Sequence, residues 1–133
     1  MIIGIGTDLL KMSGIPGAVL APGDPFYEKI FTEEEKRQAA SSPDPENWLR
    51  RRFAGKEAVF KALGEDPDRA RICEIEILDD MHGAPRAALS GSLEERAKAR
   101  GIGKIHISLS SDGDYALAFA TAEGRDRSRT EKG

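Results

Sequence analysis

The residues best placed to do chemistry begin at the N-terminus, where the segment MIIGIGTDLL follows a strand-like pattern that leads to Asp8. Gly4, Gly6 and Asp8 alternate with other residues, so a β-strand would put all three on one face. Because two positions of that face lack a side chain, another backbone or a ligand could approach closely and meet a carboxylate at the rim. The pattern also fits a turn aspartate that closes the first strand.

A second group of candidates lies on the segment 46–63, whose apolar residues recur at helical spacing. Glu57 and Lys61 stand four residues apart and would project between two faces suited to packing. Such a pair can be an ordinary surface salt bridge. The same helix carries several cations in a chain without a basic excess, and an anionic ligand would explain their concentration. These cations are Arg51, Arg52, Lys56 and Lys61.

A row of polar side chains follows in the segment 104–110, where His106, Ser108 and Ser110 alternate with apolar residues. On a strand these three share one face, at about 6.5 to 7 Å per pair. They could line a polar pocket or form an ordinary half-exposed strand face. No G-x-S-x-G or H-E-x-x-H motif offers a competing catalytic centre.

The length, composition and net charge of the chain limit the classes of protein to which these residues can belong. At 133 residues the chain suits one compact domain, and 39% hydrophobic with 32% charged residues is typical of a globular protein. Twenty Lys and Arg against 23 Asp and Glu leave a net charge of -3, which provides no general basic field for nucleic acid or an anionic membrane. The single Cys73 cannot form an internal disulfide, and the N-terminus lacks a basic leader and cleavage site, so we expect a cytoplasmic protein.

Helices are predicted from capping signals and apolar spacing. Thr32 followed by Glu35 is a capping-box pattern, which predicts a helix over 33–40. The principal helix is expected over 46–63, with Gly64 as its C-cap. A third helix is expected to begin after Ser92 and to end at Gly101.

Strands are predicted where apolar and polar residues alternate between turn signals. The expected strands are 1–10, 74–78, 86–89, 104–110 and 115–121. The last two form a hairpin around a turn at 111–113. The stretch 13–25, rich in Gly and Pro, is expected to be irregular.

These elements predict an α+β fold, in which an antiparallel sheet packs against one long helix and shorter helices. A single domain is expected over 1–123. The polar residues 124–133 are expected to form a mobile tail.

Taken together, the segments resemble the holo-acyl-carrier-protein synthases, the small bacterial type of 4′-phosphopantetheinyl transferase. The matching segments occur in the family's order and reach to about Glu123. They are GIGTDLL, FYEKIFTEEE, RRFAGKEAVFKALG, EIEILDDMHGAP and IHISLSSDGDYALAFA. The stretch RFAGKEAVFKALG is the specific signal.

The resemblance implies a Mg²⁺-dependent enzyme of fatty acid biosynthesis. It would transfer the phosphopantetheine arm of coenzyme A to a serine of an apo acyl carrier protein and release adenosine 3′,5′-bisphosphate. Asp8 and Glu57 would hold the metal, and Lys61, the third catalytic residue, would neutralise charge on the transferred phosphate. By motif match, the coenzyme-binding residues would be Arg52, Lys61, Gly64, Pro85, His106, Ser108 and Ser110. The family also implies a homotrimer with each site shared between subunits.

Several positions depart from the family pattern. Gly14 and Pro25 stand where the family commonly carries basic residues that face the acidic carrier protein, which weakens steering by complementary charge. Ala84 replaces a lysine, and Ser111 replaces a frequent second histidine. None of these changes touches the expected metal pair. Two alternatives stay open: a non-catalytic coenzyme A or nucleotide-binding module of the same fold, and a nucleotide hydrolase that uses the same carboxylates.

Overall fold

The computed structural model describes residues 1–68 and 70–125, which contain five strands, four α-helices and three short 3₁₀ helices. In chain order the elements are β1 (Ile2–Lys11), η1 (Met12–Gly14), η2 (Gly17–Leu20), α1 (Pro25–Ile30), α2 (Glu33–Ala40), α3 (Pro45–Ala62), η3 (Ile72–Glu74), β2 (Ile75–Asp79), β3 (Pro85–Leu89), α4 (Gly91–Ala99), β4 (Ile102–Asp112) and β5 (Tyr115–Gly124).

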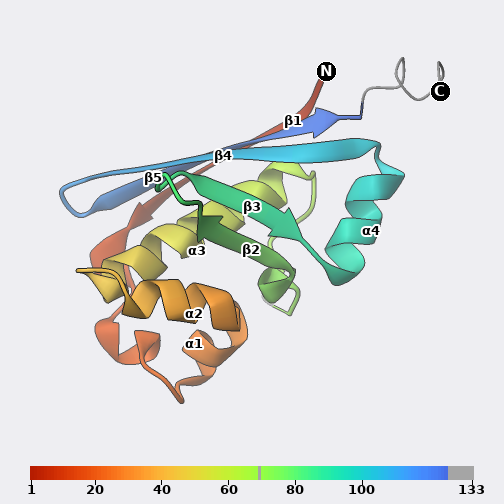
Figure 1. Ribbon diagram of the computed structural model, residues 1–133. Coiled ribbons are helices and arrows are strands. Elements are labelled where there is room, and N and C mark those ends of the chain that lie inside the picture. Colours follow the sequence, from red (N-terminus) through yellow and green to blue (C-terminus); the bar gives the residue numbers. More distant parts are fainter. Residues whose placement is uncertain (69, 126–133) are drawn as a thin grey trace.

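The strands form two antiparallel sheets, one in the order β1-β5-β4 and one made of β2 and β3. The helix α3 lies along one face of the larger sheet, with α1 and α2 gathered near its start and α4 beside β4 (Figure 1). The predicted α+β fold, with antiparallel strands packed on one long helix, is confirmed. No helix in the described part of the chain is long and apolar enough to cross a membrane.

The bare face of β1 lies directly against α3. A Cβ atom at Gly6 would overlap the carbonyl oxygen of Ala58, and one at Gly4 would overlap that of Ala62. The neighbouring strand β5 also presents small buried side chains to the helix, namely Ala116, Ala118, Ala120 and Ala122. The backbone that approaches the glycine face is therefore that of α3, and only glycine permits this approach.

A buried ion pair joins α2, α3 and β2. Lys56 Nζ lies 2.7 Å from Glu35 Oε1 and donates to the carbonyl oxygen of Ile30 at 2.7 Å. The other oxygen of Glu35 accepts the backbone N–H of Ile77 at 2.8 Å, and neither charged side chain has exposed surface. The interpretation that counted Lys56 among the cations for an anionic ligand is wrong, because its charge is used inside the core.

The C-terminal hairpin turns later than the sequence predicts. Asp112 pairs with Tyr115, so the turn consists of Gly113 and Asp114 rather than 111–113. Gly113 has a φ of 57°, a left-handed conformation that suits glycine in a two-residue hairpin.

Two further differences concern short helices and the end of the chain. The stretch predicted to be irregular contains η1 and η2, and Asp24 then caps α1 by accepting the backbone N–H of Phe26 at 2.8 Å. Gly124 ends β5, and the backbone N–H of Arg125 donates to Gly101 at 2.8 Å. The rest of the predicted tail, 126–133, lies outside the described residues.

Candidate active site

Asp8 of β1 and Lys61 of α3 meet where the strand passes the last turns of the helix. Lys61 Nζ lies 3.4 Å from Asp8 Oδ1 and donates to the carbonyl oxygen of Thr7 at 2.8 Å. Gly6 makes this approach possible, because a Cβ atom there would lie 2.8 Å from the Cβ of Lys61. Glu57 is half-buried one helical turn earlier, on the same side of α3. The packing thus joins Asp8 to Lys61, with a second carboxylate one turn away.

The surroundings of Asp8 favour a neighbouring cation. Partial burial raises the pKa of Asp8 above its ordinary value, and the charge and hydrogen bond of Lys61 lower it only in part. Within residues 1–68 and 70–125 there is no group of three or more His, Cys, Asp or Glu side chains that could hold a metal. Two carboxylates completed by phosphate and water oxygens are a common ligand set for Mg²⁺. Asp8 and Glu57 fit this donor chemistry, with the other ligands supplied by a substrate and solvent.

A separate pocket of about 260 Å³ contains three of the residues expected to bind coenzyme A: Arg52 of α3, Pro85 of β3 and Ser110 of β4. Arg52 Nη2 lies 2.5 Å from Asp79 Oδ1, and the guanidinium carbon lies 3.9 Å from the ring centre of Trp48. Trp48 Nε1 donates to Asp79 Oδ2 at 3.1 Å. The pocket therefore presents a guanidinium held by an indole and a carboxylate.

Sequence reasoning missed two members of this group. Trp48 stands four residues before Arg52 on the same helix, a spacing that could have indicated their contact. Asp79 carried no such signal, because it ends β2 and meets α3 only through the fold. Burial lowers the pKa of Arg52, and the charge and hydrogen bond of Asp79 oppose that shift.

His106 and Ser108 lie on the outer face of the β1-β5-β4 sheet, away from α3. Both are exposed, and His106 Nε2 lies 3.4 Å from Glu123 Oε1. Of the predicted polar row, Ser110 reaches the Arg52 pocket. Within one chain His106 and Ser108 therefore belong to an exposed strand face, the alternative that the sequence also allowed, whereas Ser110 lines a pocket.

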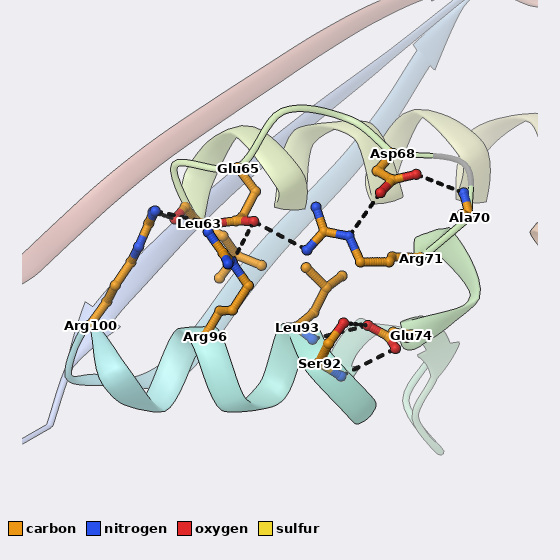
Figure 2. A network of polar contacts seen from close by, with 10 residues as sticks. All are labelled: Leu63, Glu65, Asp68, Ala70, Arg71, Glu74, Ser92, Leu93, Arg96 and Arg100. Atoms are coloured by element: carbon orange, nitrogen blue, oxygen red, sulfur yellow. Dashed lines mark hydrogen bonds and ion pairs between the residues drawn. The ribbon is translucent and has the colours of Figure 1, made fainter.

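Gly64 follows α3 with a φ of 73°, as expected of a C-cap glycine. Arg100 donates to the carbonyl oxygen of Leu63 and leaves no room for a Cβ atom at Gly64. Beside it, three arginines converge on the nearly buried carboxylate of Glu65, as Figure 2 shows. The distances to Glu65 are 3.2 Å from Arg71 Nη1, 2.8 Å from Arg96 Nε and 3.0 Å from Arg100 Nη2.

This network ties α4 to the loop after α3 and so fixes the position of Gly64. Burial acts to raise the pKa of Glu65, but hydrogen bonds from Arg96 and Arg71 and the charges of Arg96 and Arg100 outweigh it, so the pKa is lowered. No local sequence pattern indicated the role of Glu65, because its partners come from two other segments of the chain.

The fold and the grouped residues define an α+β protein with an acidic site beside a cation and a separate arginine pocket. The family model described as the 4′-phosphopantetheinyl transferase superfamily matches residues 4–120, and the chain belongs to this family. It is 38% identical over 129 residues to the holo-acyl-carrier-protein synthase of Desulforudis audaxviator, covering 97% of this chain and 98% of that protein.

Solved structures agree with this assignment. The holo-acyl-carrier-protein synthase from Neisseria meningitidis superposes with a TM-score of 0.81 at 34% identity, covering 92% of this chain and 99% of that one. The ACPS–CoA complex from Chronobacterium ammoniagenes superposes with a TM-score of 0.76 at 30% identity, covering 92% of this chain and 98% of that one.

Proposed function

We propose that this chain is a holo-acyl-carrier-protein synthase. It transfers the 4′-phosphopantetheine group of coenzyme A to a serine of an apo acyl carrier protein and releases adenosine 3′,5′-bisphosphate. The observation that carries the proposal is the contact between Asp8 of β1 and Lys61 of α3. The relatives that match this chain over nearly their whole length are holo-acyl-carrier-protein synthases. A neighbour in complex with coenzyme A supports the choice of donor.

In the reaction, the serine oxygen of the carrier forms a bond to the β-phosphorus of coenzyme A while the bridging P–O bond to the α-phosphate breaks. The electron pair of the broken bond leaves on adenosine bisphosphate, and the serine proton is lost to solvent or a nearby base. Asp8 and Glu57 would hold Mg²⁺, which would supply charge neutralisation at the pyrophosphate. The ammonium of Lys61, beside Asp8, stabilises the negative charge that grows on the same oxygens.

Binding of coenzyme A would use two groups of residues. Arg52, Pro85 and Ser110 offer a pocket for an anionic end, and the backbone around Gly64, held by Arg100, lies just after Lys61. None of the residues that line the Arg52 pocket comes from β1, which carries Asp8. A site assembled from two subunits would join the two groups, and would also bring in His106 and Ser108 from the outer sheet face.

A homotrimer is the assembly that we propose. The outer face of β1 and β5 carries large apolar side chains in adjacent register, such as Leu9 opposite Leu117. These side chains are 43% to 68% exposed in the single chain, and they are Ile3, Ile5, Leu9, Tyr115, Leu117 and Phe119. A contiguous apolar face of this kind favours burial against other copies.

Docking of the carrier protein would rely on cations other than the family's usual ones. Gly14 is exposed, no atom lies within 4 Å of the position that a Cβ would take there, and the residue itself provides no charge. Lys11 is exposed at the end of β1, and Arg51 borders the Arg52 pocket. We propose these two as the residues that meet an acidic carrier, within cytoplasmic fatty acid biosynthesis.

Mass spectrometry of an apo carrier protein incubated with the chain, coenzyme A and Mg²⁺ tests the function directly. A phosphopantetheine mass gain is expected, and it should disappear with Glu57→Gln. Coenzyme A binding without any mass gain, across the carrier proteins of the same organism, would show the non-catalytic binding module instead. Phosphate release without a carrier would show a hydrolase.

A further inference from the structure

The Arg52 pocket contains a carboxylate that opposes the binding of an anion. Among the charged residues that line it, Arg51 and Arg52 contribute two positive charges and Asp79 one negative charge, which leaves a net charge of +1. Arg52 is 4% exposed, and its Nη2 is already engaged by Asp79 Oδ1 at 2.5 Å. A phosphate that enters this pocket must therefore share the guanidinium with a carboxylate.

Asp79 is held firmly at this position. Its side chain accepts from Trp48 Nε1 at 3.1 Å, and its backbone N–H donates to Gln38 Oε1 at 2.8 Å. Gln38 Nε2 in turn donates to the carbonyl oxygen of Asp79 at 3.0 Å. Gln38 holds the backbone of Asp79, and the carboxylate itself can leave the pocket only by breaking its contacts with Trp48 and Arg52, so its charge stays next to an incoming ligand.

Arg52 keeps hydrogen-bonding capacity in the free protein. Its Nε is buried and has no hydrogen-bond partner among the described residues, although a guanidinium has five N–H donors. The guanidinium carbon lies 3.9 Å from the ring centre of Trp48, which restricts the plane of the group. The pair with Asp79 and the stacking on Trp48 therefore hold the guanidinium in one orientation before a ligand arrives.

We propose that Asp79 sets the affinity of the coenzyme A pocket. Its carboxylate is a built-in counter-anion that keeps Arg52 oriented in the free chain and limits how tightly the pocket holds the phosphates of coenzyme A and adenosine 3′,5′-bisphosphate. This inference rests on the coenzyme A site of the proposed function. A limited hold on the phosphate-bearing product favours its release after transfer.

The substitution Asp79→Asn tests the proposal, because it removes the charge with little change in shape. Isothermal titration calorimetry with adenosine 3′,5′-bisphosphate and with coenzyme A should show binding about 10-fold tighter than in the wild type, the scale of one nearby charge in a partly wet pocket. The gain should shrink as salt is added. Unchanged or weaker binding would overturn the proposal.

Glu76→Gln is the matched control. It changes the net charge by the same amount on the same strand, but Glu76 accepts from Thr32 Oγ1 at 2.6 Å rather than from Arg52. Affinity within about twofold of the wild type is expected for this variant. An equal gain in both variants would indicate a general charge effect and would overturn the assignment to Asp79.

A measurement on the wild-type chain needs no substitution. Trp48 is the only tryptophan, so a single indole N–H signal in an NMR spectrum reports on its bond to Asp79. Saturable displacement of this signal by adenosine 3′,5′-bisphosphate is expected, and an unmoved signal during binding would overturn the proposal. If the wild type binds neither ligand, the proposed coenzyme site fails as well; if it binds both and Asp79→Asn is no tighter, only this inference fails.

Discussion

At the scale of single residues, burial decides what each charge does. Lys56 and Lys61 are the same residue type on one helix, yet Lys56 is fully buried on Glu35 whereas the Lys61 side chain is 46% exposed beside Asp8. Burial gives the Lys56–Glu35 pair a structural role, because removal of either partner would leave an uncompensated charge in the core. The exposed ammonium of Lys61 stays available to a ligand. Helical spacing alone does not separate these two roles.

Asp8→Asn should stabilise the folded chain at neutral pH. Burial raises the pKa of Asp8 in the folded state, so the folded protein holds that proton more tightly than the unfolded chain, and ionisation of Asp8 costs stability. The gain from Asn should be complete above the raised folded pKa and should vanish as pH falls toward the ordinary value of 3.8. Urea unfolding of both proteins over about pH 4 to 8 measures it. A variant less stable than wild type at neutral pH would contradict this expectation.

Lys61→Met should lower the transfer rate by about 100-fold or more, because a cation is lost where charge develops on phosphate. Stability should change by less than about 1 kcal/mol, since the pair with Asp8 is partly exposed. Rates from carrier mass spectra and urea unfolding give the two quantities. Lys98→Met, which removes an exposed cation from α4, serves as the control and should leave the rate unchanged.

At the scale of elements, the site depends on how closely β1 approaches α3. Glycine on the strand and alanine on the helix bring the two backbones into contact, and this contact sets Asp8 beside Lys61. The helix α4 contributes in another way, because Arg96 and Arg100 reach across to Glu65 and hold the loop after α3. The packing of these elements therefore determines both the position of Asp8 beside Lys61 and the position of the loop that contains Gly64.

Gly6→Ala should destabilise the chain by about 2–3 kcal/mol and reduce transfer, because the new Cβ would overlap the carbonyl oxygen of Ala58, which belongs to a helix backbone and cannot move aside. Gly14→Ala is the matched control, since no atom lies within 4 Å of a Cβ there. Its stability should stay within about 0.5 kcal/mol of wild type. Equal urea midpoints for the two variants would show that the close approach of β1 to α3 is not needed.

At the scale of the whole molecule, one face of the larger sheet is covered by α3 and the other exposes large apolar side chains. The proposed trimer accounts for this asymmetry and for the division of the site residues into separate groups. A slight net negative charge of -3 does not prevent association, because the outer face of β1 and β5 is mainly apolar.

Phe119→Arg should convert the trimer to a monomer, since it places a charge in the middle of the exposed face of β5. Light scattering after size-exclusion chromatography measures the mass. Met81→Arg is the control, because Met81 is 91% exposed in the β2–β3 turn and should leave the mass unchanged. A wild-type monomer would overturn the trimer itself.

Mixed oligomers should reveal a shared site. Asp8→Asn and Arg52→Met should each abolish transfer, but random exchange of subunits between the two variants places an intact Asp8 opposite an intact Arg52 in about a quarter of the sites. Recovery of up to about a quarter of wild-type activity is therefore expected after mixing. Two inactive variants that stay inactive after proven subunit exchange would show that each chain holds its own site.

The sequence by itself determined the α+β class, the principal helix with its Gly64 cap, and the glycine face that precedes Asp8, because periodicity, capping and missing side chains are local properties. It also placed Arg52, Pro85 and Ser110 in one site through the family resemblance, and one pocket contains all three. Only the tertiary structure decided that Lys56 belongs to the core, that Asp79 and Trp48 hold Arg52, and that Glu65 gathers three arginines. These outcomes depend on contacts between segments far apart in the chain. Local sequence patterns do not specify which distant residue will pair with a buried charge.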